Sequence, residues 1–281
     1  MTVPRERVLK AGDGTQLFVT DFSPVPHDQA NTPIARDGIV IMHGLGEHGA
    51  RYLHVARLLN TLGWSVRIYD HRGHGRSGGA RGDTPDDDAL VQDAKIVIDD
   101  FARQLAQPPI LLGHSMGGLF AARFATAGLS PLRGLILSSP ALALPLSGIE
   151  KTLLKLLSAT APGFGVASGL KVRYLSHDHA VVDAYKTDPL VHGKISARLL
   201  RSMLGAVESA QAQAGRLQIP TLMVVAGDDK LVDAEGSRQF FAHLALGIGT
   251  LHWYDGFYHE LFNETDARRV LADLQEWLAE R

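Results

Sequence analysis

The chain has 281 residues, which fits one large α/β domain with an insertion or two small domains, and its apolar fraction of 45% is ordinary for a globular protein. Its net charge of −2 leaves no basic surplus, which argues against tight nucleic-acid binding because phosphate neutralisation requires clustered Lys and Arg. The absence of cysteine excludes disulfides, thiol catalysis and Cys-ligated metal sites.

The N-terminal segment Met1–Lys10 is charged and no apolar run follows it, so the sequence predicts no signal peptide. No stretch reaches the ~18 consecutive apolar residues that a membrane span requires. We therefore expect a cytoplasmic protein.

Short apolar strands alternate with longer amphipathic helices along most of the chain. In chain order the patterns predict strands at 16–22, 38–42, 64–69, 109–112, 132–137, 221–225 and 250–254, and helices at 52–62, 87–105, 117–127, 234–246 and 266–278. This alternation indicates an α/β fold with a mostly parallel sheet covered on both faces. Ligands bind such sheets beyond the carboxyl ends of the strands, so we expect the functional side chains in the turns that follow strands.

The stretch between Ser138 and Thr221 interrupts this alternation and is too long for a simple connection. Apolar residues recur in it at helical spacing from Ile149 to Leu157, and a second amphipathic helix is predicted at 196–213. We therefore predict a helical lid over the site at 145–213, with 1–144 and 214–281 as the core. The alternative is that these helices extend the core and cover nothing. A Gly- and Pro-rich segment, 161–169, is predicted to be a mobile turn within the lid.

Two segments match the pattern G-x-S-x-G, Gly113–Gly117 and Gly75–Gly79. The turn that presents a nucleophilic serine requires a strand before it and a helix after it. Ser115 has both, whereas Ser77 lies in a glycine-rich loop that no helix follows. The context therefore predicts Ser115 as a nucleophile and Ser77 as an ordinary loop residue.

A nucleophilic serine needs a histidine to take its proton and an acid to orient that histidine. Of the histidines that follow Ser115, His259 alone comes after a predicted strand and before a helix. The acid is expected after the strand 221–225, where Asp228 and Asp229 both qualify and position does not distinguish them.

Backbone amides are expected to stabilise the negative oxygen of the tetrahedral intermediate. One belongs to Met116, which follows the nucleophile, and the other to Leu45, in the turn after the strand 38–42. The alternative for the second turn is a strand end without substrate contact.

Longer segments resemble the monoacylglycerol lipase and lysophospholipase-like branch of the α/β hydrolases, in the serine aminopeptidase S33-type (Hydrolase_4) family. They are HGLGEHGARY (43–52), YDHRGHGRSGGARG (69–82), GHSMGG (113–118), GDDKLVD (227–233), YDGFYHELFNE (254–264) and, in the predicted lid, DPLVHGKISARL (188–199). The resemblance covers about residues 10 to 280.

The resemblance implies an α/β-hydrolase fold with a helical lid inserted after its sixth strand. It also implies Asp229 as the acid, and Glu47 and Arg51 as residues that bind the alcohol part of the ester. Mammalian members have a His near the glycerol where this chain has Phe262, so strict preference for monoacylglycerol is not implied.

We therefore predict a serine hydrolase that cleaves carboxylic esters of fatty acids, above all monoacylglycerol or lysophospholipid, through an acyl-enzyme on Ser115 and without a cofactor or metal. The leucine-rich lid would receive the acyl chain and contact membrane surfaces transiently.

Three alternatives remain open from the sequence. The same mechanism would serve short- or medium-chain esters, thioesters or acyl transfer, because fold and triad do not fix the substrate. A metal enzyme would use His71 and His74, or His177 and His179, although their spacing matches no recognised metal site. A non-catalytic binding protein on the same fold is the third.

Overall fold

The computed structural model of the chain describes residues 4–23 and 36–281. Residues 1–3 and 24–35, which belong to the predicted core segment 1–144, lie outside the described residues, as does the start of the N-terminal segment discussed above.

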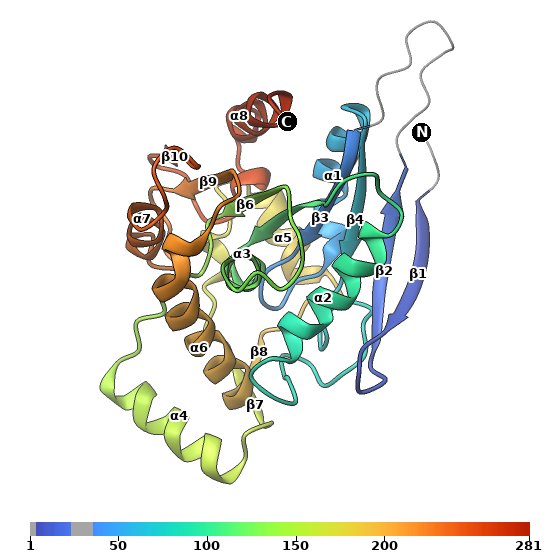
Figure 1. Cartoon of the computed structure of the whole chain (residues 1–281). Coiled ribbons are helices and arrows are strands. Elements are labelled where there is room, and N and C mark those ends of the chain that lie inside the picture. Colours follow the sequence, from blue (N-terminus) through green and yellow to red (C-terminus); the bar gives the residue numbers. More distant parts are fainter. Residues whose placement is uncertain (1–3, 24–35) are drawn as a thin grey trace, which may run out of the picture.

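An eight-stranded sheet, with the order β1-β2-β4-β3-β5-β6-β9-β10, forms the centre of the described part of the chain (Figure 1). β2 (Gln16–Phe22) is antiparallel to β1 (Arg5–Lys10) and to β4, and the other neighbouring strands are parallel. The remaining strands are β3 (Arg36–Met42), β4 (Trp64–Tyr69), β5 (Ile110–His114), β6 (Gly134–Ser138), β9 (Thr221–Ala226) and β10 (Gly249–Tyr254). The mostly parallel sheet predicted from the sequence is confirmed, and β1 is an edge strand that the sequence analysis did not predict.

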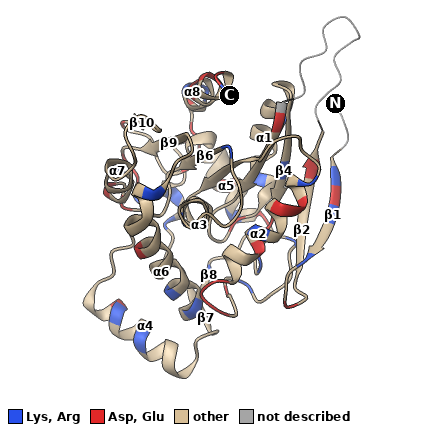
Figure 2. Ribbon diagram, viewed as in Figure 1, with Lys and Arg blue, Asp and Glu red and all other residues tan. Residues whose placement is uncertain are grey.

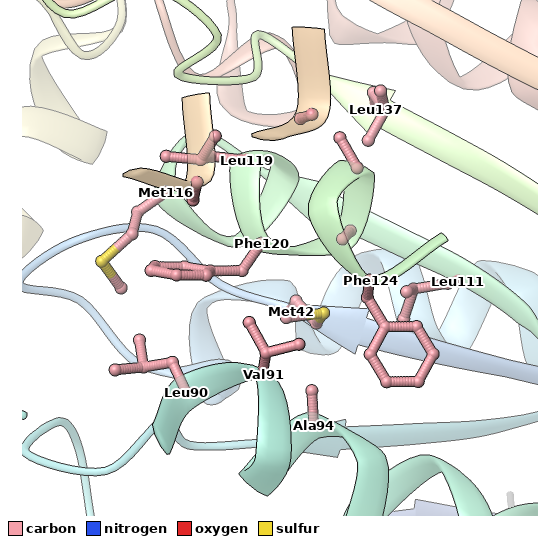
Figure 3. Close-up of a cluster of buried hydrophobic side chains, with 14 of the residues drawn as sticks. Met42, Leu90, Val91, Ala94, Leu111, Met116, Leu119, Phe120, Phe124 and Leu137 are labelled. Carbon is pink, nitrogen blue, oxygen red and sulfur yellow. The ribbon is translucent and has the colours of Figure 1, made fainter. Parts of the chain in front are cut away.

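Helices cover both faces of the sheet, and alternate residues of each strand are buried on opposite faces. In β3, Ile39 and Ile41 pack with the helices α1 (Leu53–Thr61) and α8 (Ala267–Ala279). Val40 and Met42 pack on the opposite face with α2 (Ala89–Ala102), α3 (Met116–Thr126) and α6 (Ala197–Gln213). Figure 3 shows Phe120 of α3 facing the side chains of α2. The segment between β6 and β9, residues 139–220, is called the insertion. The helices outside the insertion are α1 (Leu53–Thr61), α2 (Ala89–Ala102), α3 (Met116–Thr126), α7 (Glu235–Ala242) and α8 (Ala267–Ala279).

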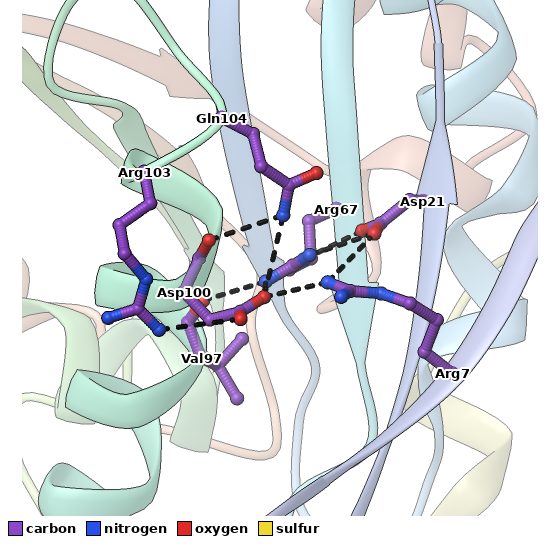
Figure 4. A network of polar contacts seen from close by, with 7 residues as sticks. All are labelled: Arg7, Asp21, Arg67, Val97, Asp100, Arg103 and Gln104. Atoms are coloured by element: carbon purple, nitrogen blue, oxygen red, sulfur yellow. Dashed lines mark hydrogen bonds and ion pairs between the residues drawn. The ribbon is translucent and has the colours of Figure 1, made fainter.

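A buried arginine ties the antiparallel edge of the sheet to α2. Arg67 of β4 is fully buried and pairs with Asp21 of β2 at 2.6 Å and with Asp100 of α2 at 2.7 Å. Arg7 of β1 contacts both carboxylates, as Figure 4 shows. A buried guanidinium requires such partners, because an unpaired buried charge is strongly destabilising.

The segment between β6 and β9 contains three helices and a two-stranded sheet. The helices are α4 (Gly148–Thr160), α5 (His179–Thr187) and α6 (Ala197–Gln213), and the sheet pairs β7 (Gly165–Ala167) with β8 (Lys194–Ser196). The predicted turn at 161–169 therefore contains a strand, and α5 was not predicted. No described helix is long and apolar enough to cross a membrane.

Candidate active site

Ser115 occupies a sharp turn between β5 and α3. Its backbone has φ 54° and ψ −119°, a conformation that is unusual for a residue with a side chain and that commonly marks functional sites. The flanking glycines permit the turn, since a Cβ on Gly117 would lie 2.3 Å from the Met42 carbonyl oxygen and one on Gly113 would lie 2.4 Å from that of Gly117. Ser115 therefore sits at the N-terminus of α3, where the helix dipole favours negative charge.

His259 and Asp229 form a buried hydrogen-bonded pair. The imidazole Nδ1 of His259 lies 2.6 Å from Oδ2 of Asp229, and the backbone amides of Leu231 and Val232 donate to the other carboxylate oxygen at 2.8 and 3.1 Å. Asp228 turns away and pairs with Lys230. The structure thus brings Asp229, not Asp228, to the histidine.

The pairing moves the pKa of both groups toward their charged forms. Burial would raise the pKa of Asp229, but the charge of His259 and the hydrogen bonds to the carboxylate lower it. Burial would lower the pKa of His259, but the charge and hydrogen bond of Asp229 raise it above its usual value. The ring of His114 packs beside that of His259, and burial together with the charge of His259 lowers the pKa of His114 to about 3.

Ser115 and His259 line the same cavity, which has a volume of about 620 Å³ and lies between the strand ends and the insertion. The Ser115 hydroxyl makes no hydrogen bond with any residue in the described part of the chain. The hydrogen bond from Nδ1 to Asp229 leaves Nε2 of His259 available to a proton donor. Leucines contributed mainly by the insertion line much of the rest of the cavity, a volume and lining typical of small-molecule sites.

Leu45 and Met116 also line the cavity, and neither backbone amide donates to another described residue. The loop that carries Leu45 is held by buried imidazoles. His43 Nε2 accepts from the His71 amide at 3.0 Å, and Nδ1 donates to the Gly44 carbonyl at 2.8 Å. Burial lowers the pKa of His43, which keeps the ring neutral in this position.

Glu47 and Arg51 form a buried network beneath this loop. Glu47 accepts hydrogen bonds from the Gly44 amide at 2.5 Å, from the Tyr52 hydroxyl at 2.7 Å and from Arg51 at 2.8 Å. Burial would raise the pKa of Glu47, but Arg51 lowers it to about 2. Arg51 also pairs with Glu260. Glu47 lines the cavity, whereas Arg51 does not.

The sequence analysis missed two polar residues of the cavity lining that contact Arg51, Tyr185 and Glu260. Glu260 directly follows His259, and this adjacency was the signal available to find it. Burial raises the pKa of the Glu260 carboxyl, even though Arg51 opposes the shift. Phe262 is buried in the apolar core and does not line the cavity.

Ser77 and His177, two other candidates from the sequence, have structural partners. The Ser77 hydroxyl donates to the Asp70 carbonyl at 2.6 Å and accepts from the Phe18 amide at 2.8 Å, so it fixes a loop to β2. His177 pairs with Glu264 at 2.8 Å. Across residues 4–23 and 36–281, no group of three or more His, Cys, Asp or Glu side chains is arranged to hold a metal ion.

The strand order, the serine turn after β5 and the acid and histidine after β9 and β10 define an α/β hydrolase. The family model described as "Serine aminopeptidase, S33" (Hydrolase_4) matches residues 33–266, and the chain belongs to this family.

Named relatives agree with this assignment. The chain is 37% identical to a monoacylglycerol lipase of Mycolicibacterium smegmatis over 86% of this chain and 88% of the relative. It is 35% identical to the phospholipase YtpA of Bacillus subtilis over 86% and 94%. The crystal structure of Paleococcus ferrophilus monoacylglycerol lipase superposes with a TM-score of 0.83 at 34% identity, covering 94% of this chain and 98% of that one. The chain is a carboxylic ester hydrolase.

Proposed function

We propose that this hydrolase cleaves fatty-acid esters of small alcohols, monoacylglycerol first among them, with Ser115 as nucleophile, His259 as base and Asp229 as the acid. The observation that carries the proposal is the buried His259–Asp229 pair on the same leucine-lined cavity as the strained turn of Ser115. The monoacylglycerol lipase relatives support the substrate class.

In the proposed reaction the ester carbonyl oxygen accepts hydrogen bonds from the Leu45 and Met116 amides. Nε2 of His259 takes the Ser115 proton while Oγ attacks the carbonyl carbon. When the intermediate collapses, His259 returns that proton to the leaving alcohol and the acyl group stays on Ser115. Water that His259 deprotonates then attacks the acyl-enzyme, which releases the fatty acid and restores the serine. Asp229 remains ionised and stabilises the charged imidazole.

The segment 145–213 acts as the lid in this proposal, with the fatty acyl chain packed among its leucines. Glu47 and Arg51 act at the alcohol end, Glu47 at the cavity surface and Arg51 through the carboxylates that it pairs.

The outer face of α4 is suited to transient contact with a lipid surface. Ile149 and Leu156 are 83% and 59% exposed, and Lys151 and Lys155 interleave with them, where Figure 2 shows basic positions along the helix. Exposed apolar side chains next to lysines favour an interface with anionic lipid headgroups.

Replacing the nucleophile tests the proposal. Ser115→Ala should lower the turnover of a monoacylglycerol or a p-nitrophenyl ester by roughly 10³-fold or more, and it should abolish labelling by a fluorophosphonate probe. Ser77→Ala is the matched control from the other G-x-S-x-G segment. It removes hydrogen bonds to Asp70 and Phe18 and should reduce thermal stability while labelling and turnover persist. Turnover retained in Ser115→Ala would remove Ser115 from the role.

A further inference from the structure

We propose that Glu260 determines which leaving alcohols the enzyme accepts. It accepts a hydrogen bond from the hydroxyl of an uncharged polyhydric alcohol, admits cationic alcohols and repels phosphorylated ones. This inference rests on the proposed function, since it concerns the alcohol that His259 protonates.

Glu260 lines the cavity and has one carboxylate oxygen without a hydrogen-bond partner among the described residues. The side chain is only 4% exposed and lines the cavity. Oε2 accepts hydrogen bonds from Arg51 and from the side-chain amide of Asn263, the latter at 2.8 Å. Oε1 accepts no hydrogen bond from the described residues. Because Glu260 lines the cavity, this oxygen is available to accept a hydrogen bond from a ligand hydroxyl.

Three polar side chains place Glu260 at the alcohol end of the cavity. Glu47, Tyr185 and Glu260 all line the cavity, and all three contact Arg51. The Tyr185 hydroxyl also lacks a hydrogen bond to another described residue. An acyl chain packs among leucines, so the alcohol is left with this polar end. The proposed reaction also requires the leaving oxygen to lie beside His259, the residue next to Glu260.

The charges at this end do not cancel. Arg51 supplies one positive charge to two carboxylates, those of Glu47 and Glu260. Lys230 is the single Lys or Arg among the described residues that line the cavity, and it pairs with Asp228. A phosphate on the leaving alcohol would therefore meet net negative charge from two buried carboxylates, whose repulsion is less screened than that of exposed groups.

Esters with one acyl chain and different alcohols test this inference. The substrates are monodecanoylglycerol and its phosphate monoester, and decanoylcholine and the uncharged isostere that has carbon in place of the quaternary nitrogen. In the wild-type protein, kcat/KM should be about 10-fold or more higher for monodecanoylglycerol than for its phosphate monoester. It should also be about 10-fold or more higher for decanoylcholine than for the uncharged isostere. Glu260→Gln keeps an oxygen for Arg51 and removes the charge. It should reduce both ratios by about 10-fold.

Glu276→Gln, on the exposed surface of α8, makes the same change in net charge away from the cavity and should leave both ratios unaltered. Ratios in Glu260→Gln equal to those of the wild type, with hydrolysis intact, would overturn the inference. If Glu260→Gln does not fold, the wild-type protein still tests the inference. Equal kcat/KM values for decanoylcholine and its uncharged isostere would also overturn it. Failure of the proposed function looks different, since wild type would then hydrolyse none of the four esters.

Discussion

Two regions that border the cavity are held in place in different ways. One is the rim, formed by the polar groups around Asp229, His259 and Glu47, and the other is helix α4. At the rim, buried hydrogen bonds fix each group, as between Asp229 and His259 and between Glu47 and the Gly44 amide. In α4 no residue is buried, and Ser147 and Glu150 cap the helix with reciprocal hydrogen bonds. Figure 1 shows α4 at the lower edge of the molecule, away from the sheet.

This difference corresponds to two requirements of the reaction, the positioning of the groups that transfer a proton and the binding of the acyl chain. A proton transfer requires donor and acceptor within hydrogen-bond reach, and rigid buried contacts provide that positioning. An acyl chain is bound by apolar contacts that are not directional, so its part of the cavity does not require a fixed hydrogen-bond network. We therefore expect substitutions at the rim to affect the rate on every ester, and substitutions on the outer face of α4 to affect only esters presented at a lipid surface.

The largest effect is expected at the acid. Asp229→Asn removes the charge that stabilises the protonated His259 and favours the wrong imidazole tautomer, so kcat should fall by about 10³- to 10⁴-fold. Asp228→Asn is the matched control, because among the described residues the neighbouring carboxylate pairs only with Lys230 on the surface, and it should retain nearly full activity. Steady-state kinetics on a soluble ester measure both. Equal losses in the two variants would contradict the assignment of Asp229.

The pH dependence of the rate should report the same pair. The proposed base, His259, acts in its neutral form, and Asp229 raises its pKa above the usual value of 6.5. Activity is therefore present above this raised pKa, and kcat/KM should fall by about 10-fold per pH unit below it. In the residual activity of Asp229→Asn the midpoint should move to lower pH, since the negative charge is gone. A midpoint that does not move would show that the carboxylate of Asp229 does not raise the pKa of His259.

The rim was largely predictable from the sequence because its positions follow from strand ends. Buried strands have a recognisable apolar pattern, and their carboxyl ends meet at one edge, so Ser115 and His259 could be chosen by position alone. The choice between Asp228 and Asp229 required the family resemblance, since it depends on the direction in which each side chain turns.

The remaining features depend on contacts that no local pattern contains. The pair Arg51 and Glu260 joins residues 209 positions apart, so only the folded chain shows that Glu260 shares a guanidinium with Glu47. β1 was missed because four of its six residues are charged, which suits an exposed edge strand. β7 and β8 have three residues each, too few for a period to appear.

The smallest effect is expected on the outer face of α4. Ile149→Ser combined with Leu156→Ser removes two exposed apolar side chains that do not line the cavity. The variant should hydrolyse a soluble short-chain ester at the wild-type rate, whereas its rate on monoacylglycerol in anionic phospholipid vesicles should fall by roughly 3- to 10-fold, because less apolar surface enters the interface. Leu246→Ser, at a fully exposed position outside the insertion, is the control and should change neither rate. An equal fall on both substrates would mean that α4 shapes the active site itself, and the separation between rim and helix would then fail.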